Sequence, residues 1–250
     1  MVNGQSVYLS WIIPAYNEVQ RIEKTIREVD LYLRAKNFEY EIVVVDNASR
    51  DDTSGVVGRV SRELPRLRLL RTQGPGKGWA VKEGMLNAAG EIRVFADADN
   101  SVSPEQANAF LEFICSAERP SQCYDVVVGS IEVPGAQIQE NAQWYRRLLG
   151  KFSKYVIRAV AGLWQIRDTQ RGFKFFSRRA AEIIFPRLTI TTWGFDIEVL
   201  LIAKRHGLRV KELPVRWINP SDSKVGLGAY VTTFSELIKI KWNDLKGRYV

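Results

Sequence analysis

Hydrophobic residues follow two different spacings in the first half of the chain. Short continuous apolar runs bounded by turn residues are typical of strands that are buried on both faces. After the first run, apolar residues recur at the spacing of one helix face, at Ile22, Ile26, Val29 and Leu33. The pattern predicts strands over residues 7–13, 41–46, 67–71 and 91–97, with helices after the first strand and over residues 77–89. This alternation predicts an α/β fold whose mostly parallel sheet is covered by helices on both faces.

The second half has a less regular pattern. The run "DVVVGS" at 125–130 extends the sheet, and "RVKELPVRW" at 209–217 predicts a further strand. Helices are predicted over residues 140–165, from about 178, over 195–206 and from about 230. No internal repeat or linker interrupts the chain, so we expect a main domain over residues 1–226 and a C-terminal helical extension over 227–250.

Polar segments follow three of the predicted strands. These segments are "PAYNE" after the first strand, "DNASRDDT" after the second and "DADNS" after the fourth. In a parallel sheet covered by helices, ligands bind outside the carboxyl ends of the strands. The sequence therefore predicts one ligand site that these three segments share.

Charge is distributed unevenly along the chain. Residues 1–125 contain 15 Lys and Arg against 18 Asp and Glu, a net charge of −3, whereas residues 126–250 contain 21 against 10, a net charge of +11. A basic half favours an anionic partner, such as a membrane surface, a phosphorylated substrate or nucleic acid.

Cysteine and histidine are scarce. Cys115 and Cys123 fit neither a disulfide framework nor a metal cluster, and a single histidine, His206, excludes a multi-histidine metal site. His206 precedes Gly207, which is typical of a helix C-terminus. The N-terminus lacks the pattern of a secretory signal, and no run is long enough to span a membrane, so we expect an intracellular protein.

Two carboxylates, Asp97 and Asp99, follow the fourth strand in "FADADNS". Residues at i and i+2 of an extended segment lie on one side, so the two charges repel each other. A solvated turn is one explanation, because Asp, Asn and Ser favour turns. The other is a divalent cation such as Mg²⁺ or Mn²⁺, which prefers carboxylate oxygens.

Three further residues near the strand ends suit a nucleotide. Lys77 lies between two glycines at the start of a helix, where backbone N–H groups favour a diphosphate; the alternative is a Pro/Gly turn with a solvated lysine. Asp46 ends a buried strand, a common position for a carboxylate that binds a nucleoside. Glu18 opens a helix, where it either binds substrate or complements the helix dipole.

Several segments together resemble the inverting, nucleotide-sugar-dependent glycosyltransferases of family 2. They are "IIPAYNE", "VVVDNASRDDT", "GKGWAVKEGMLNAAGE" and "FADADNS", in that order. In the second half, "DTQRGFKFFSRRAAEIIFPRL", "WGFDIEVLLIAKRHG" and "ELPVRWINPSDSKV" resemble the branch that makes dolichyl- or polyprenyl-phosphate glucose and mannose. The resemblance covers residues 7–226 and implies a GT-A fold. It also implies a donor that is UDP-glucose or GDP-mannose, of which "WGFDIEVL" and "SDSKV" favour the glucose donor.

The resemblance assigns the donor site. The nucleotide sugar would be bound by Pro14, Ala15, Tyr16, Glu18, Asp46, Lys77, Asp97, Ala98 and Asp99. Asp97 and Asp99 match the family's Asp-x-Asp signature, which together with Ser101 would hold Mg²⁺ or Mn²⁺. Asp168 and Gln170 match the "DTQ" signature that faces the donor sugar. Asp168 and Asp196 are candidate sugar-positioning residues or weak bases; the alternative for Asp196 is to cap its helix.

The acceptor site is expected in the basic half. Basic residues recur along one predicted helix at Arg147, Lys151, Lys154 and Arg158, beside an apolar face of Leu149, Phe152, Val156, Val160 and Leu163. Such a helix suits an anionic membrane surface, although a core helix with a solvated face has the same pattern. The candidates for binding a lipid phosphate are Arg146, Arg147, Arg171, Arg178 and Lys224. The family often has Cys where this chain has Arg171, which leaves the role of that loop open.

We therefore expect a metal-dependent enzyme that transfers a hexose to dolichyl or polyprenyl phosphate, peripheral on the cytosolic face of a membrane. One alternative is a glycosyltransferase that acts on a sugar hydroxyl. A second is a basic, non-catalytic module that binds membrane or nucleic acid, although no recognised nucleic-acid-binding motif occurs in the sequence.

Overall fold

The computed structural model describes residues 6–117, 123–139, 144–218 and 227–250. Seven strands form one sheet in the order β3-β2-β1-β4-β7-β5-β8. Their bounds are β1 Leu9–Ala15, β2 Tyr40–Asn47, β3 Leu67–Thr72, β4 Ile92–Ala96, β5 Val126–Ser130, β7 Phe173–Ser177 and β8 Val210–Pro214. All neighbours pair in parallel except β7, which is antiparallel to both β4 and β5. The predicted mostly parallel sheet is confirmed.

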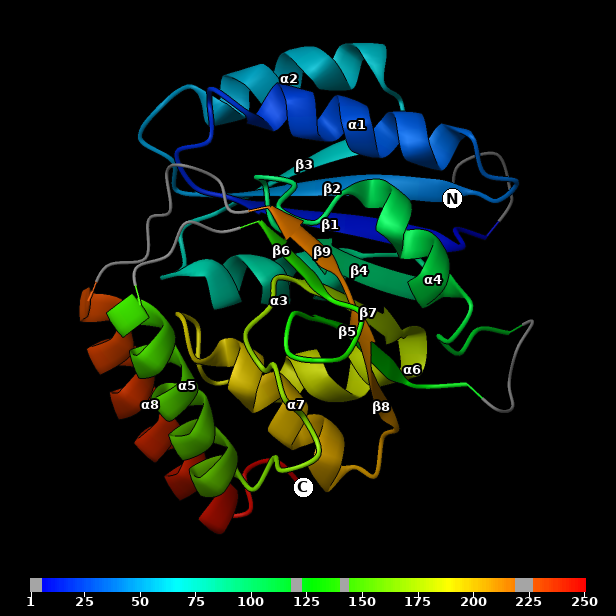
Figure 1. Ribbon diagram of the computed structural model, residues 1–250. Coiled ribbons are helices and arrows are strands. Elements are labelled where there is room, and N and C mark those ends of the chain that lie inside the picture. The colour runs from blue at the N-terminus through cyan, green and yellow to red at the C-terminus, as the bar shows by residue number, and fades with distance from the viewer. Residues whose placement is uncertain (1–5, 118–122, 140–143, 219–226) are drawn as a thin grey trace.

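Helices cover both faces of this sheet (Figure 1). One face packs against α1 (Ile22–Arg34), α2 (Thr53–Glu63) and α4 (Ala107–Leu111), and the other packs against α3 (Lys77–Asn87), α6 (Arg178–Ile184) and α7 (Phe195–Arg205). Because successive residues of a strand point to opposite faces, Ile12 enters one hydrophobic cluster and Ile13 the other. The sheet is therefore buried on both sides, as its continuous apolar strands require.

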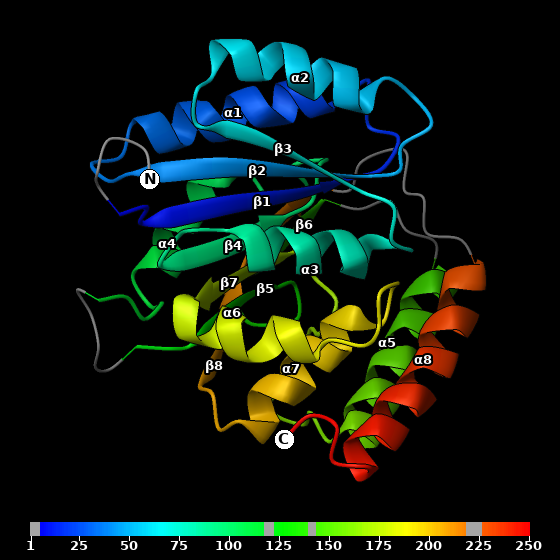
Figure 2. The same ribbon diagram turned by 180° about the vertical axis from the view of Figure 1, so that it is seen from behind.

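The remaining elements lie beside this three-layer core. Helices α5 (Trp144–Ala161) and α8 (Leu227–Leu245) pack side by side and away from α1 and α2, as Figures 1 and 2 both show. A two-stranded parallel sheet joins β6 (Gln137–Gln139) to β9 (Arg216–Ile218). Among the described residues, no helix combines the length and the apolar character that crossing a bilayer requires.

Three details differ from the sequence prediction. The pattern did not indicate β7 or α2, and the strand expected over residues 209–217 divides into β8 and β9, which belong to different sheets. Cys115 and Cys123 form a disulfide, contrary to expectation. Their segments lie side by side because Ile114 and Tyr124 form a β-bridge, which brings the two cysteine Cα atoms within 4.9 Å. His206 ends α7 before Gly207, as predicted.

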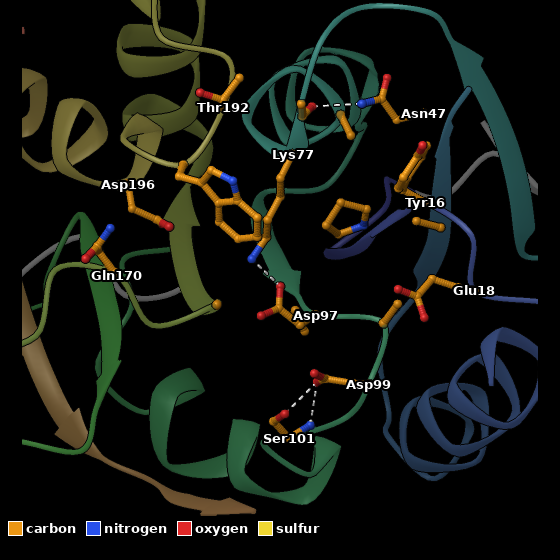
Figure 3. A pocket seen from close by; sticks show the side chains of 18 of the residues that line it. Tyr16, Glu18, Asn47, Lys77, Asp97, Asp99, Ser101, Gln170, Thr192 and Asp196 are labelled. Carbon is orange, nitrogen blue, oxygen red and sulfur yellow. Dashed lines mark hydrogen bonds and ion pairs between the residues drawn. The ribbon is translucent and has the colours of Figure 1, made fainter. Parts of the chain in front are cut away.

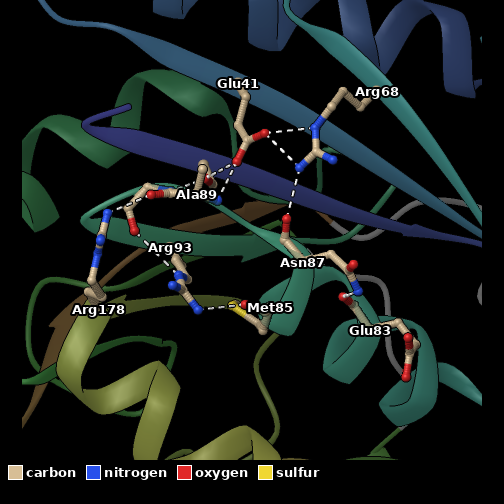
Figure 4. A network of polar contacts seen from close by, with 10 residues as sticks. Glu41, Arg68, Glu83, Met85, Asn87, Ala89, Arg93 and Arg178 are labelled. Carbon is tan, nitrogen blue, oxygen red and sulfur yellow. Dashed lines mark hydrogen bonds and ion pairs between the residues drawn. The ribbon is translucent and has the colours of Figure 1, made fainter. Parts of the chain in front are cut away.

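A polar network holds the connection between α3 and β4 (Figure 4). Buried Glu41 accepts hydrogen bonds from Ser10 Oγ at 2.6 Å and from the Ala89 N–H at 2.7 Å. Buried Arg93 donates to the Met85 carbonyl at 2.7 Å. This network lies at the amino end of β4, opposite the edge at which the polar segments follow the strands.

Arg178 belongs to this opposite edge. Since β7 is antiparallel to β4, its last residue, Ser177, pairs with Ile92 at the start of β4. Arg178 follows directly and donates to the Ala89 carbonyl at 2.6 Å. The structure therefore places Arg178 at the edge opposite the polar segments, and we no longer assign it to the acceptor.

Candidate active site

A cavity of about 880 Å³ opens at the carboxyl ends of β1, β2 and β4. Its walls come from the loops that follow β1, β2, β3 and β4, from the loop before β7, from the loop before α7, and from Trp217 in β9. Most of the expected site residues line it: Pro14, Ala15, Tyr16, Glu18, Lys77, Asp97, Ala98, Asp99, Ser101, Gln170, Arg171 and Asp196. The sheet topology thus gathers residues from most of the chain into one site (Figure 3).

The loops after β1 and β2 brace each other at one end of the cavity. The Asn17 N–H donates to Ser49 Oγ at 3.0 Å, and the Arg50 N–H donates to Asn17 Oδ1 at 2.8 Å. Asn17 and Ala48 both have positive φ, 55° and 56°. Non-glycine residues in that region are strained and cluster at functional sites. The double cross-link therefore holds a strained and rigid edge for a ligand.

Asp46 supports this edge from behind. Its carboxylate accepts hydrogen bonds from the Ser49 N–H at 3.1 Å and from the Ser54 hydroxyl, and it does not line the cavity. The next residue, Asn47, lines the cavity instead and donates to the Gly76 carbonyl at 2.8 Å. The sequence predicted that Asp46 would line the site, whereas Asn47 lines the cavity, because β2 extends one residue further than predicted and successive residues of a strand point to opposite sides.

Asp97 and Asp99 lie on the loop after β4, in the middle of the cavity (Figure 3). Lys77 Nζ lies 2.5 Å from Asp97 Oδ1. Asp99 Oδ1 accepts hydrogen bonds from the Ser101 hydroxyl at 2.7 Å and from its N–H at 2.9 Å. Burial acts to lower the pKa of Lys77, but Asp97, Asp196 and Asp99 outweigh it, so the pKa lies above its ordinary value. Lys77 is therefore a cation that faces two carboxylates.

A glycine gives this loop its close approach to the loop before β7. A Cβ on Gly172 would lie 2.1 Å from Asp97 Oδ2, and the Gly172 carbonyl accepts from the Asp97 N–H at 3.2 Å. A larger residue at position 172 would displace the carboxylate. Gly172 therefore joins the loop that carries Arg171 to the loop that carries Asp97.

The oxygen atoms of Asp97, Asp99 and Ser101 are the donor type that hard divalent cations prefer. In the part of the chain that the structure describes, no three His, Cys, Asp or Glu side chains gather as a metal-binding group. Mg²⁺ commonly takes one or two carboxylates and completes its shell with water and substrate phosphates. These residues therefore fit a divalent cation that is shared with a phosphorylated ligand.

A buried ion pair lies beside the two aspartates. Lys174 Nζ is 2.5 Å from Asp196 Oδ1 and donates to the Arg171 carbonyl at 2.6 Å. Lys174 is fully buried, whereas Asp196 is 4% exposed and lines the cavity. Burial lowers the pKa of Lys174 and raises that of Asp196, and the attraction between them opposes both changes. Asp196 is thus committed to this pair and does not cap α7, since no side chain caps that helix.

Asp168 lies behind the cavity wall, contrary to the expectation that it faces the donor sugar. It is 1% exposed, accepts from the Ile131 N–H at 3.2 Å and forms an ion pair of 3.3 Å with Arg171 Nε. Burial acts to raise the pKa of Asp168, but Arg171, Lys154 and the Ile131 N–H outweigh it and hold the pKa below its ordinary value. Asp168 is therefore an ionised carboxylate that holds the Arg171 side chain in place.

Arg171 is the expected phosphate ligand that the structure brings to the cavity. Its guanidinium carbon lies 4.7 Å from the centre of the Trp217 ring. Asp168 on one side and Trp217 on the other leave the guanidinium at the cavity wall with a fixed orientation. The side chains of Arg146, Arg147 and Lys151, and all of Lys224, lie outside the described residues.

Sequence reasoning missed several cavity residues, among them Asn47, Thr192, Trp193 and Trp217. Their signals were weak, because a single Trp or Thr in a loop is common at any surface. Lys174 was also missed, because a lysine within "FKFFS" indicates an exposed position. Only the fold reveals that it is fully buried against Asp196.

Comparisons with known proteins are consistent with this geometry. The profile of the family described as "Glycosyl transferase family 2" matches residues 10–185. A dolichyl-phosphate beta-glucosyltransferase of Trichomonas vaginalis is 34% identical over 241 residues, which cover 94% of this chain and 73% of that protein. The enzyme of the same name from Saccharomyces cerevisiae is 29% identical over 99% of this chain and 78% of its own length.

Solved structures have the same fold. Glucosyl-3-phosphoglycerate synthase from Mycobacterium tuberculosis, in complex with Mn²⁺, UDP-glucose and phosphoglyceric acid, superposes with a TM-score of 0.67. The two chains are 17% identical, and the match covers 94% of this chain and 80% of that one. This likeness establishes the GT-A-type fold that the sequence predicted.

Proposed function

Since the chain belongs to glycosyl transferase family 2 and is a nucleotide-sugar-dependent glycosyltransferase, we propose that it transfers glucose from UDP-glucose to a dolichyl or polyprenyl phosphate. The relatives named above are dolichyl-phosphate beta-glucosyltransferases, and their similarity extends over nearly the whole chain. The observation that carries the proposal is the position of Arg171. Asp97 and Asp99 lie at the centre of the cavity, and Arg171 lies at its wall between Asp168 and Trp217. A guanidinium held in this way suits a phosphate acceptor.

The donor binds with its nucleoside against the braced loops after β1 and β2. Its diphosphate lies at the N-terminus of α3, where Lys77 supplies a positive charge and the positive end of the helix dipole favours an anion. Asp97, Asp99 and Ser101 would hold Mg²⁺ or Mn²⁺, and such a cation would supply positive charge against the negative charge that grows on the leaving diphosphate. Asp196 and Gln170 line the cavity beyond Lys77, where the glucose lies.

A phosphate acceptor needs no strong general base, because it is already ionised near neutral pH. A phosphate oxygen forms the bond to the anomeric carbon as the bond to the diphosphate oxygen breaks. A single displacement of this kind inverts the α-linked donor and gives a β-linked product. Arg171 orients the acceptor through charge-assisted hydrogen bonds.

A donor panel tests this proposal. UDP-glucose, GDP-mannose and UDP-N-acetylglucosamine are each incubated with a short polyprenyl phosphate and Mn²⁺, and the product is identified by mass spectrometry and NMR. We expect UDP-glucose to be used at least about tenfold faster than the other two, with a β-linked product. An α-linked product, or transfer to free glycans and never to a lipid phosphate, would refute the proposal.

Replacing Arg171 with Ala should raise the apparent KM for polyprenyl phosphate about tenfold or more and leave the KM for the donor nearly unchanged. Losing a charge-assisted contact costs about 1.5–3 kcal/mol. Arg178→Ala is the matched control, since Arg178 lies at the opposite edge of the sheet. If the two variants had the same acceptor KM, Arg171 would have no part in acceptor binding.

We further propose that α5 and α8 contact an anionic membrane surface, where a lipid acceptor is found. On α8, Phe234, Ile238, Trp242 and Leu245 recur on one face and are 55–71% exposed. Tyr155 on α5 and Trp164 just after it are also exposed. Lys239 is exposed on α8, and Lys246, directly after α8, lies with its ammonium 4.6 Å from the centre of the Trp242 ring. Exposed aromatic and basic residues on two neighbouring helices suit the membrane interface. The cytosolic leaflet carries the anionic lipids, which favours contact on that face.

Vesicle binding tests the membrane contact. The double variant Ile238→Ser, Trp242→Ser should bind vesicles of phosphatidylserine and phosphatidylcholine at least about tenfold more weakly, because each apolar side chain contributes about 1.5–3 kcal/mol when buried. Binding of the unchanged protein should also fall as salt rises. Leu31→Ser is the control, since Leu31 is 71% exposed on α1. Equal cosedimentation of all three proteins would exclude the α8 surface.

A further inference from the structure

The C-terminal helix α8 contributes a carboxylate that holds a segment of the cavity wall. Glu236 Oε2 accepts a hydrogen bond from the Gly194 N–H at 2.7 Å, and Glu236 Oε1 accepts one from the Thr192 hydroxyl. The residue between these two partners, Trp193, lines the cavity and is 38% exposed. One carboxylate thus fixes the backbone on both sides of a tryptophan that faces the substrate site.

The inner face of α8 is suited to this contact. Asn243 lies seven residues after Glu236, which places both on the same side of the helix. Asn243 Nδ2 donates to Thr189 Oγ1 at 3.0 Å, so α8 holds the segment 189–194 at both ends. The exposed residues Ile238 and Trp242 belong to the other side of the helix. The C-terminal extension, which the sequence analysis separated from the main domain, therefore supports a segment of the cavity wall from outside.

The opposite side of this segment packs against the loop at the start of α3. The Trp79 N–H donates to the Thr191 carbonyl at 3.0 Å. A Cβ on Gly76 would lie 2.6 Å from the same carbonyl, and a Cβ on Gly194 would lie 2.9 Å from Glu236 Oε2. The Gly76 approach depends on glycine, because the atom that it meets belongs to the backbone and its φ is 81°. The segment that carries Trp193 is therefore held between α8 and the loop assigned to the diphosphate.

The location of this segment indicates which part of the donor it meets. In Figure 3, Thr192 and Asp196 lie on one side of Lys77 and Asp97, and Tyr16 and Glu18 lie on the other. A donor with its nucleoside beside Tyr16 and its diphosphate at Lys77 reaches the Thr192 side with its sugar. Aromatic side chains in ligand pockets provide a large apolar surface of fixed orientation, and the C–H face of a hexose suits such a surface.

We propose that Trp193 packs against the transferred hexose and that Glu236 is the positioning residue that holds it there. The identity of the hexose rests on the proposed function. The two hydrogen bonds by which Glu236 holds Thr192 and Gly194, which we call the clamp, are those described above. It assigns a role in donor recognition to a residue in the last helix of the chain, 43 positions from the tryptophan that it holds.

A double-mutant cycle tests the coupling. Trp193→Ala and Glu236→Ala should each lower kcat/KM for the preferred donor about tenfold or more, and the double variant should lose little beyond Trp193→Ala alone, since Glu236 acts through Trp193. Affinity for UDP, which has no hexose, should change less than about twofold. The proposal would be overturned if the two losses of kcat/KM multiplied in the double variant. It would also be overturned if affinity for UDP fell as much as kcat/KM.

Two further variants separate positioning from folding. Glu236→Gln keeps an oxygen that accepts from the Gly194 N–H, so it should recover a large part of the activity lost in Glu236→Ala. Asp244→Asn is the matched control, because Asp244 is also on α8 but pairs with Arg205 through a bond of 2.6 Å, away from the cavity. We expect its kcat/KM to stay within about twofold of the unchanged protein. If Asp244→Asn matched Glu236→Ala, the effect would be general loosening of α8.

Hydrogen exchange checks the clamp independently of the donor. Peptides that cover residues 189–195 should exchange at least about tenfold faster in Glu236→Ala than in Asp244→Asn, both without ligand. If the donor panel selects another nucleotide sugar, the cycle is repeated with that donor and its nucleoside diphosphate. Faster exchange with an unaffected donor KM and kcat would show that Glu236 orders the segment but that Trp193 does not contact the hexose. Unchanged exchange would refute the clamp.

Discussion

Replacing Asp99 with Asn is expected to lower the turnover number at least about a hundredfold and to leave the fold intact. Removing one preorganised electrostatic contribution to a transition state commonly has an effect of this size. An amide oxygen still accepts the hydrogen bonds from Ser101 that the carboxylate accepts now. The charge is therefore the main property that changes.

Asp99 is a cleaner test than Asp97. Asp97 pairs with Lys77 at 2.5 Å, so its replacement also leaves a largely buried cation without its nearest partner. In the Asp99 variant, Mn²⁺ binding measured by calorimetry in the presence of UDP should weaken together with turnover. Asp52→Asn is the control, because that carboxylate is exposed and pairs with Arg59 on the surface. Full turnover of Asp99→Asn, or full activity of the unchanged protein in EDTA, would remove the metal from the proposal.

The parts of the site that the sequence predicted lie at the ends of regular strands. Continuous apolar runs identify β1, β2 and β4, and the topology of a parallel sheet requires their carboxyl ends to meet. Asp97, Asp99 and Glu18 could therefore be placed at one cavity before any coordinates were considered. Lys77 could be added because glycines and a helix start form an anion site from the backbone alone.

The remaining parts depend on contacts between distant segments. Asp168 and Asp46 both belong to signatures that suggest substrate contact, but each carboxylate binds a neighbour in the chain. Asp46 accepts from the Ser49 N–H behind the cavity, and Asp168 pairs with Arg171 in its wall. No local pattern distinguishes a carboxylate that binds a ligand from one that binds a loop. The disulfide between Cys115 and Cys123 likewise depends on a β-bridge between Ile114 and Tyr124. Two cysteines eight residues apart do not predict that bridge.

Among the substitutions considered, the replacement of Lys174 is expected to lower the stability of the folded protein most. Replacing it with Met keeps the volume of the side chain nearly constant but leaves Asp196 buried without the cation 2.5 Å away. Removing one partner of a buried ion pair costs about 3–5 kcal/mol, which is a large share of the 5–15 kcal/mol that typically separates folded from unfolded protein. The midpoint of urea unfolding should fall accordingly.

A second substitution shows where that loss comes from. In the double variant Lys174→Met, Asp196→Asn neither charge remains, so most of the lost stability should return. The hydrogen bond from Lys174 to the Arg171 carbonyl is still missing in the double variant, so transfer should stay impaired although the protein is stable. A double variant as unstable as Lys174→Met would show that the hydrogen bond to Arg171, and not the buried charge, is the main contribution.

The pH dependence follows from the raised pKa of Asp196, whose first cause is burial. Without Lys174 only the more distant Lys77 opposes that effect, so the pKa rises further above the value of about 3.9 in the unfolded chain. The folded state then binds a proton that the unfolded state has released, and stability falls as pH rises from the unfolded pKa through the folded one. The deficit of Lys174→Met relative to the unchanged protein should therefore grow as the pH rises above about 4, whereas the deficit of the double variant should stay constant. Urea unfolding at several pH values measures both, and a pH-independent deficit in the single variant would mean that Asp196 does not carry the buried charge.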